Sequence, residues 1–211
     1  MDIIKLNGIS KSFGNKKIFT DYSLNIAEKE FVAITGKSGA GKSTLLNIMG
    51  LMEKCDKGEY EICGIKCPRL GTKAATNLLR TELAYLFQNF ALINDRTVKY
   101  NLDIALKFTG KTRKEKDEAI NNVLEKVGLT GYENKEVNIL SGGEQQRIAF
   151  ARIMLKPSRI IFADEPTGNL DHQNRDHVMN LLTELNKQGK TIIVVTHDSE
   201  VVKYAHRVIK L

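Results

Sequence analysis

A glycine-rich loop at residues 36–43, GKSGAGKS, constrains the fold of this chain more than any other feature. It follows an apolar run at residues 31–35, which is typical of a strand covered on both faces, and it runs into a leucine-rich helical pattern. Strand, loop and helix in this order form the context in which the pattern binds phosphate. The alternative, a glycine-rich turn before an ordinary helix, leaves that order unexplained. The sequence therefore predicts a nucleotide-binding loop.

Each residue type in this loop has a chemical reason to be there. Glycines let backbone N–H groups approach a triphosphate closely, and the helix that follows adds the positive end of its dipole. We expect Lys42 to reach the β- and γ-phosphates and the Ser43 hydroxyl to ligate Mg²⁺. The predicted phosphate-binding residues are Gly36, Lys37, Ser38, Gly39, Ala40, Gly41, Lys42, Ser43 and Thr44.

Composition and charge narrow the class of protein. The chain has 211 residues, of which 42% are hydrophobic and 27% are charged, so it can bury a substantial α/β core. Its net charge of +7 comes with scattered lysines and no basic tract. We therefore expect no nucleic acid partner.

Two absences in the sequence bear on location. No apolar run approaches the roughly 18 residues of a membrane span, and the N-terminus lacks the pattern of a secretory signal. The odd set of cysteines, Cys55, Cys63 and Cys67, indicates reduced thiols without a zinc site. We expect a cytoplasmic protein, to which another chain would supply any membrane crossing.

Hydrophobic periodicity gives the expected elements. Residues 2–35 are predicted to form strands, antiparallel at first, and residues 59–65 are predicted to form one further strand. After the phosphate loop, Leu45, Leu46, Ile48, Met49 and Met52 recur at helical spacing, so we expect all five in the core. Helices are also predicted at 72–81, 97–107, 113–127, 171–188 and 199–205, and strands at 83–87, 159–163, 191–195 and 207–211.

The helical stretch in the middle of the chain interrupts a framework of alternating strands and helices. That framework resumes with the apolar run at residues 159–163. We therefore predict one domain, residues 1–211, of class α/β. Residues 1–89 and 157–211 would form its nucleotide-binding core with an antiparallel β part, and residues 90–156 would form an inserted helical part.

Polar side chains follow three of the predicted strands where each strand ends. Asp164 and Glu165 follow one strand, His197 another and Gln88 a third. Ligands of open α/β sheets bind at this edge. Asp164 would hold Mg²⁺ and Glu165 would polarise the attacking water, while His197 would hydrogen-bond the γ-phosphate and hold that water and Glu165 in line, and Gln88 would sense metal and water. Solvated acids before a turn and an ordinary surface histidine are the alternatives.

Residues 141–144, SGGE, have two interpretations. The pattern is a capping box, with Ser141 as N-cap and Glu144 three residues later. Capping alone, however, does not need Gly142 and Gly143, which cost helix stability at the first two helical positions. The glycines are explained if backbone N–H groups must approach an anion closely. We therefore predict a second phosphate-binding element, which serves a nucleotide on another molecule.

Taken in order, these motifs resemble those of the ABC-transporter ATPase domains. The resemblance extends over essentially the whole chain, and the run LSGGEQ at residues 140–145 together with the phosphate loop is its most specific part. It implies the ABC ATPase fold, with a mostly parallel core sheet, an antiparallel β part and an inserted helical part. Phe13, otherwise a core or turn aromatic, would stack on adenine, and Asp171 would lie across a dimer interface.

The resemblance also implies partners. Two copies would sandwich two ATP and Mg²⁺, with Ser141, Gly142 and Gly143 contacting the γ-phosphate bound by the other copy, while Gln88 faces a membrane subunit. Residues 164–171 resemble the group that serves macrolide exporters, lipoprotein-release systems, peptide exporters and the cell-division ATPase. We expect a peripheral subunit at the cytoplasmic face of the membrane that powers a permease for export or membrane extraction of a hydrophobic drug, peptide or lipoprotein. The resemblance leaves open whether an extracytoplasmic adaptor takes part.

Three alternatives remain at this point. An ATPase of the cell-division kind would transmit a mechanical signal through a membrane partner without moving a substrate. A soluble ABC-type ATPase acting on ribosomes or DNA would carry a second ATPase domain or a long coiled-coil insertion, which this sequence lacks. A small-molecule kinase would have no use for residues 140–145 or for His197.

Overall fold

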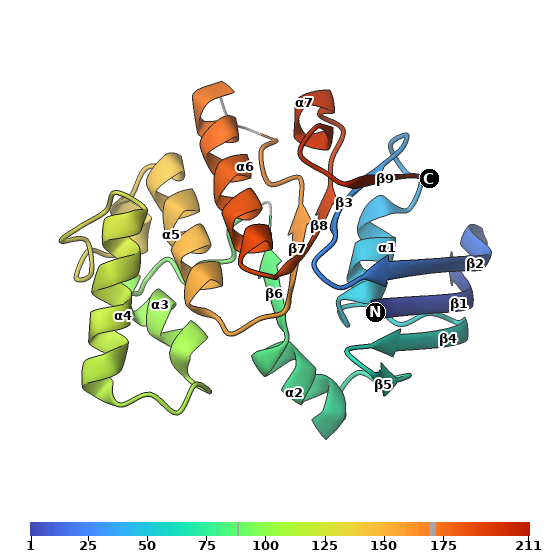
Figure 1. The fold of residues 1–211 in the computed structure, drawn as a ribbon, viewed down its shortest axis with the longest axis horizontal. Helices are drawn as coiled ribbons and strands as arrows, with labels where there is room; N and C mark the ends of the chain where they lie inside the picture. The colour runs from blue at the N-terminus through green and yellow to red at the C-terminus, as the bar shows by residue number, and fades with distance from the viewer. Residues whose placement is uncertain (88, 169–171) are drawn as a thin grey trace.

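The computed structural model describes residues 1–87, 89–168 and 172–211, which form two sheets and a helical part (Figure 1). The larger sheet has the order β6-β7-β8-β3-β9, and all four pairings are parallel. This confirms the expected parallel core. Its strands are β3 (Phe31–Thr35), β6 (Leu83–Leu86), β7 (Ile160–Asp164), β8 (Thr191–Val195) and β9 (Arg207–Lys210).

The central strands are buried on both faces, as their continuous apolar runs predict. In β7, Ile160 and Phe162 point into one hydrophobic core, while Ile161 and Ala163 point into another. This alternation follows from the two-residue period of a strand. Because helices cover both faces, the polar residues of these strands are confined to the ends, where the candidate site forms.

The smaller sheet is antiparallel, with the order β2-β1-β4-β5. Its strands are β1 (Asp2–Phe13), β2 (Lys16–Ala27), β4 (Lys57–Ile62) and β5 (Ile65–Lys66). The prediction of one strand at residues 59–65 is wrong. Cys63 and Gly64 have φ angles of 51° and 76° and form a two-residue turn, so that Ile62 pairs with Ile65 across a hairpin.

Helix α1 (Lys42–Met49) lies between the two sheets (Figure 1) and contributes Leu45, Leu46, Ile48 and Met49 to the core that both share. The expectation for Met52 is wrong, since its side chain is 46% exposed. The helix ends at Gly50, and Leu51 then adopts a left-handed φ of 61°, which turns the chain away from the core.

The opposite face of the parallel sheet is covered by α5 (Gly142–Leu155), α6 (His172–Lys187) and α7 (Ser199–Val202). Helix α7 is three residues shorter than the predicted 199–205. Helix α2 (Lys73–Thr81) packs at the edge of the core that contains α1. No helix in the described part of the chain is long and apolar enough to cross a membrane.

The helical part has a hydrophobic core of its own. It consists of α3 (Val98–Leu106), α4 (Arg113–Lys126), the short 3-10 helix η1 (Val137–Ile139) and one side of α5. Helix α5 contributes Ile148 and Ala151 to this core but Ala149, Phe150 and Ile153 to the core against the sheet. It is therefore the element that joins the helical part to the parallel sheet (Figure 1).

One buried polar side chain organises the entry into the helical part. Asn101 on α3 has 0% exposure. Its Oδ1 accepts a hydrogen bond from the Ile93 N–H at 2.7 Å, and its Nδ2 donates to the carbonyls of Ile93 and Thr97, each at 3.0 Å. A buried side chain thus satisfies three backbone groups of the loop before α3.

We expect Asn101→Ala to lower the free energy of unfolding by about 1–3 kcal/mol, because it removes three hydrogen bonds and leaves the Ile93 N–H without a partner, whereas the carbonyls of Ile93 and Thr97 keep backbone donors. Urea denaturation followed by circular dichroism measures the change. The matched control is Asn122→Ala on the exposed side of α4, which should change stability by less than about 0.5 kcal/mol. Equal effects of the two substitutions would contradict this account of Asn101.

Candidate functional site

The phosphate loop joins β3 to α1, and only glycine fits at position 41 of this loop. This residue has a φ of 96°, and a Cβ there would lie 2.5 Å from Cγ2 of Ile18 and 2.8 Å from Cζ of Phe19, both on β2. A side chain is thus excluded by both conformation and space. The contact places the antiparallel sheet directly against the start of α1.

The start of α1 is left open toward solvent. Helices α2, α3, α4, α5 and α7 each begin with a side chain that caps the first turn, but α1 begins at Gly41 with no such bond. The first N–H groups of a helix need a partner, and an anion is a suitable one. The open N-terminus of α1 therefore has the chemistry of a phosphate site.

A cleft of about 360 Å³ lies at this open end. Six of the nine predicted phosphate-binding residues line it, together with Glu165 and with Val195 at the end of β8. The ammonium group of Lys42 donates hydrogen bonds to the carbonyls of Gly36 at 2.9 Å and Lys37 at 3.1 Å, which hold it against the loop. The six lining residues from the loop and helix are Ser38, Gly39, Gly41, Lys42, Ser43 and Thr44.

Asp164, at the end of β7, lies near the hydroxyl of Ser43 at the start of α1. Burial raises the pKa of Asp164, and the nearby Ser43 hydroxyl and the charge of Lys42 partly offset this rise. The structure therefore brings together Ser43 and Asp164, two of the three residues that the sequence predicts for Mg²⁺; the third, Gln88, lies outside the described residues. Hydroxyl and carboxylate oxygens are ligands that this ion accepts.

Glu165 and His197 also meet, although they follow different strands. Nδ1 of His197 lies 2.8 Å from Oε1 of Glu165. Glu165 has a left-handed φ of 46°, and its N–H donates to the carbonyl of Val195 at 2.9 Å, which turns its side chain toward the cleft. The hydrogen bond and negative charge of Glu165 raise the pKa of His197.

Phe13 lies in the turn region of the β1–β2 hairpin, where its side chain is 49% exposed. It is not part of the cleft lining; the ammonium of Lys11 lies 4.6 Å from the centre of its ring.

Lys16 and Ile18 on β2 do line the cleft, and the sequence analysis predicted neither of them. Only the pairing of Phe13 with Lys16 could have indicated them, and that register is not visible in the sequence.

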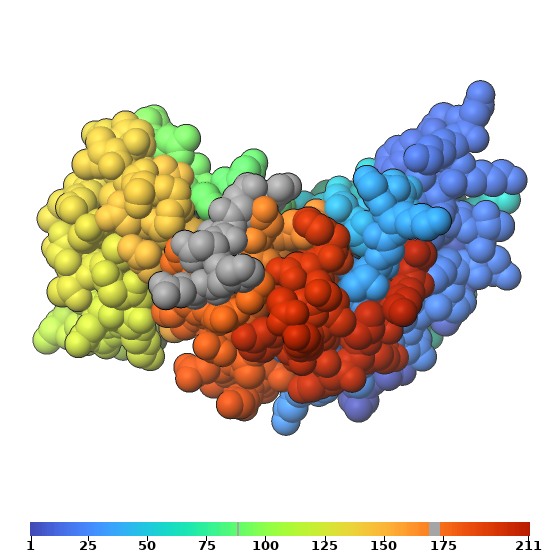
Figure 2. Space-filling view, turned by 90° about the horizontal axis from the view of Figure 1, so that it is seen from above, coloured from blue at the N-terminus to red at the C-terminus, as the bar shows by residue number. Residues whose placement is uncertain are grey.

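Two of the predicted site residues, Gln88 and Asp171, lie outside the described residues. The segment at 141–144 is described, but it does not line the cleft. Seen from above, the gold surface around the start of α5 and the light-blue surface of the phosphate loop lie on opposite sides of the view (Figure 2). Within one chain, the two predicted phosphate-binding elements therefore do not face a common cleft.

The capping box at the start of α5 is present as predicted. The Ser141 hydroxyl accepts a hydrogen bond from the Glu144 N–H at 3.3 Å, while the Glu144 carboxylate accepts one from the Ser141 N–H at 2.8 Å. Tyr132 adds a further bond to this carboxylate at 2.8 Å. The bonds from Ser141 and Tyr132 lower the pKa of Glu144 to about 2, so it is ionised at neutral pH.

Nothing within the described chain requires glycine at the two positions that follow. Gly142 and Gly143 do not have a left-handed φ, and a Cβ at Gly142 would meet no atom within 4 Å. At Gly143 the nearest atom would be Nη1 of Arg147 at 3.9 Å. Gly142 and Gly143 thus weaken the helix, and neither the backbone conformation nor the packing of the described residues requires glycine at these positions.

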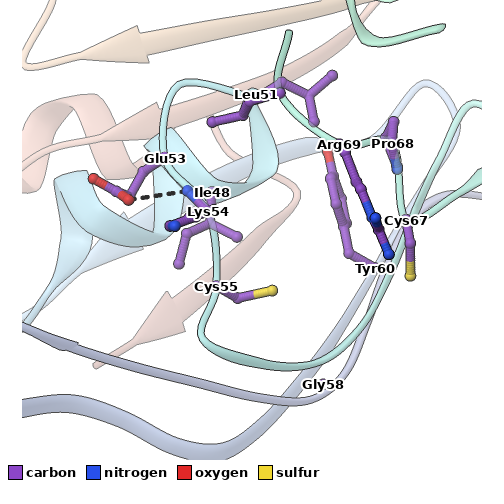
Figure 3. A pocket seen from close by; sticks show the side chains of 11 residues that line it. Ile48, Leu51, Glu53, Lys54, Cys55, Gly58, Tyr60, Cys67, Pro68 and Arg69 are labelled. Carbon is purple, nitrogen blue, oxygen red and sulfur yellow. Dashed lines mark hydrogen bonds between the residues drawn. The ribbon is translucent and has the colours of Figure 1, made fainter. Parts of the chain in front are cut away.

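A second pocket, of about 360 Å³, lies between the end of α1 and β4 (Figure 3). Its lining includes Cys55 and Cys67 together with Tyr60 but none of the predicted site residues. Cys55, Cys63 and Cys67 are all free thiols, and burial raises the pKa of Cys63 to about 11. Such a thiol is mostly protonated at neutral pH and unreactive.

Comparison with known proteins places these features in a family. Residues 19–168 match the family described as ABC transporter. Over 213 aligned residues, the chain is 36% identical to the macrolide export ATP-binding/permease protein MacB 1/2 of Paracoccus denitrificans and 38% identical to MacB of Bradyrhizobium diazoefficiens. These alignments cover 99% of this chain but 32% and 33% of the two relatives. The chain thus spans about a third of the length of the curated relatives it matches.

Solved structures agree with this assignment. A dimeric structure of the ATP-binding cassette MJ0796, in a post-hydrolysis state bound to ADP and Pi, is 37% identical and superposes with a TM-score of 0.88. The match covers 99% of this chain and 94% of that one. The fold is that of an ABC ATPase cassette, which confirms the predicted fold class. The chain belongs to the ABC transporter family.

Proposed function

We propose that this chain binds and hydrolyses ATP and uses the energy to power a membrane permease. The observation that carries the proposal is the single cleft that combines the open start of α1, Lys42 and Glu165 beside the Ser43–Asp164 pair. Residues 1–89 and 157–211 would form the nucleotide-binding core, and residues 90–156 the inserted helical part. The ADP and Pi in the MJ0796 cassette support the choice of nucleotide.

Within the cleft, the loop N–H groups and Lys42 would bind the phosphates, and Phe13 would stack on the base at the rim. The Ser43 hydroxyl and the Asp164 carboxylate fit Mg²⁺, since both are oxygen ligands and lie near each other. The ion would neutralise phosphate charge. Gln88 is proposed as a further metal and water ligand from its place in the sequence.

Glu165 would act as the general base. A water between its carboxylate and the γ-phosphate would lose a proton to it during attack. The 2.8 Å contact with His197 fixes the direction of the carboxylate, so we assign His197 the role of positioning Glu165. Lys42 would stabilise the charge that develops on the phosphate oxygens.

The second half of each site would come from another copy of the chain. The unexplained glycines at 142 and 143 and the rigid capping box support this, because close approach to an anion is the remaining reason for glycine there. Ser141, Gly142, Gly143 and Glu144 would thus complete the cleft of the partner copy, with Asp171 at the same interface. The dimeric MJ0796 cassette supports this arrangement.

The permease partner is proposed from the relatives. The MacB proteins are named for macrolide export and combine an ATP-binding part with a permease in one chain, of which this chain matches about a third. We therefore propose a site at the cytoplasmic face of a membrane and a cargo that is a hydrophobic drug, a peptide or a lipoprotein. Recovery of a membrane-spanning protein with the chain tests this point, and recovery of ribosomes or DNA alone would contradict it.

We expect Glu165→Gln to lower the ATP turnover rate by about 10²–10⁴-fold, because the amide cannot accept the proton. ATP affinity should remain, since the phosphate-binding loop is untouched. Steady-state phosphate release and equilibrium binding of a fluorescent ATP analogue measure the two effects. The control Glu200→Gln removes a carboxylate on α7 and should preserve turnover. Full turnover in Glu165→Gln would disprove the assigned role.

We also expect His197 to titrate above its ordinary pKa of 6.5 in the free protein, because Glu165 stabilises the imidazolium. The ion pair is therefore complete below pH 6.5 and is lost as the pH rises through the raised pKa. NMR titration of the imidazole measures this value. In Glu165→Gln it should fall toward 6.5, whereas Glu200→Gln should leave it in place. An unshifted His197 would contradict the observed contact.

Replacement of Gly142 should separate stability from assembly. We expect Gly142→Ala to raise the free energy of unfolding by roughly 0.5–1 kcal/mol, yet to weaken ATP-driven dimerisation, because the added methyl group would face the partner's phosphate. Thermal denaturation and light scattering in the Glu165→Gln background measure the two effects. Gly128→Ala, at a φ of 69°, should do the reverse: it loses stability but keeps dimerisation. Unchanged dimerisation in Gly142→Ala would contradict the shared site.

A further inference from the structure

Lys11, near the end of β1, is a buried cation that does not line the nucleotide cleft. Its exposure is 4%, and lysine is rarely buried to this degree unless its charge is paired. The ammonium group lies 2.8 Å from Oε1 of Glu53 and 3.7 Å from Oδ1 of Asp56. Two carboxylates thus hold one ammonium group at a fixed place beneath the surface.

Both carboxylates come from the loop that joins α1 to β4, and the start of this loop is tied to α1. The N–H groups of Met52 and Glu53 donate to the carbonyl of Asn47 at 2.8 Å and 3.1 Å. Oε1 of Glu53 also accepts a hydrogen bond from the N–H of Lys54 at 3.0 Å (Figure 3). The position of the Lys11 ammonium therefore depends on α1, the helix whose other end carries the phosphate loop.

The end of the same loop holds the backbone of β1. The Asp56 N–H donates to the carbonyl of Ser10 at 2.8 Å. Oδ2 of Asp56 accepts a hydrogen bond from the Ser12 N–H, also at 2.8 Å. Lys11 lies between these two residues, so the chain is fastened to the loop on both sides of it. The backbone that leads into Phe13 is fixed in the same way.

The Lys11 ammonium also lies over the ring of Phe13, 4.6 Å from its centre, which is within the range of a cation–π contact. The Phe13 side chain is 49% exposed and belongs to none of the three hydrophobic cores of the described chain. Packing in a core therefore does not fix the orientation of this ring. The cation covers one face of the ring and leaves the opposite face for a ligand.

We propose that Lys11 is a positioning residue for the base of the nucleotide. Its ammonium group, held by Glu53 and Asp56, orients the Phe13 ring so that the free face receives the adenine. The inference rests on the proposed function, which gives Phe13 the stacking role. Lys11 itself does not touch the ligand. Through the loop at residues 53–56, α1 would place the stacking ring as well as the phosphate loop.

The test compares a ligand that has a base with one that has none. Mg²⁺–ADP and Mg²⁺–pyrophosphate are titrated into the full chain by calorimetry. We expect Lys11→Met to weaken ADP binding by about 3–10-fold and to change pyrophosphate binding by less than about twofold. Methionine keeps an apolar stem but has no charge. Lys11→Arg keeps a cation over the ring, so it should bind ADP as the wild type does.

A matched control is available on the same strand. Lys5 is also paired with a carboxylate, Oε1 of Glu61 at 3.2 Å, and Lys5→Met should leave both affinities unchanged. Thermal denaturation should show that Lys11→Met is folded. The two carboxylates that lose their partner have side chains that are 32% and 41% exposed, so water can solvate them.

A double variant tests whether Lys11 acts through the ring. Phe13→Ala alone should weaken ADP binding and leave pyrophosphate binding in place. In the Phe13→Ala background, Lys11→Met should have no further effect on ADP binding, because the two residues act on the ligand through one contact.

The outcomes separate this inference from the proposed function. Wild-type ADP affinity in Lys11→Met, with weaker binding in Phe13→Ala, would overturn the role of Lys11 and leave the stacking role standing. Equal losses for ADP and pyrophosphate, or additive losses in the double variant, would also overturn it, because a general effect on the fold would explain them. Unchanged ADP binding in Phe13→Ala would instead overturn the stacking role, and the inference with it.

Discussion

The position of α1 between the two sheets is the constraint on which the rest of the structure depends. Its apolar side is shared with β1 and β4 on one side and with β3, β7 and β8 on the other. Its N-terminus meets β2 at Gly41, where only a hydrogen atom fits. Packing of this apolar side against both sheets fixes the direction of the helix axis, and the axis fixes where the open N–H groups point. The cleft is thus a consequence of core packing rather than of the loop alone.

The two helix starts proposed to contact phosphate differ in how their first turns are capped. The start of α1 carries no side-chain cap and remains available to a ligand from its own chain. The start of α5 is fully capped by Ser141 and Glu144, yet it carries glycines that its own chain does not use. In the proposed site, the first arrangement would offer unpaired N–H groups to an anion. The second would present a rigid surface to an anion held by another copy, as a site divided between two molecules requires.

Local patterns predicted most of the fold and the membership of the cleft. Continuous apolar runs predicted the buried strands. The polar residues that follow those strands predicted that Asp164, Glu165 and His197 lie at one edge of the parallel sheet, and of these three Glu165 lines the cleft. Errors arose where a single backbone angle decided the outcome. The positive φ at Leu51 moved Met52 out of the core, and the turn at Cys63 and Gly64 divided one predicted strand into a hairpin. Leu51 and Cys63 are residue types that rarely adopt a positive φ, so the sequence gives little sign of these turns; of the three residues, only Gly64 adopts such angles readily.

The sequence could not predict which residues are brought together by strand register and by packing between separate elements. Lys16 and Ile18 enter the cleft only because the register of the hairpin and the contact at Gly41 place β2 over the loop. A groove of about 390 Å³ between the parallel sheet and the helical part is likewise lined by residues of α2, β6, α3 and α5, which no local pattern connects. Surfaces of this kind become visible only when the fold is known.

Helix α5 has a mechanical property that follows from its two hydrophobic sides. Its 14 residues span about 21 Å, with the capped glycines at one end and Lys156 at the other. Because its side chains are packed into both cores, α5 cannot shift along its axis without displacing side chains of the sheet core and of the helical core at once. A change at either end of α5 therefore concerns both parts of the molecule.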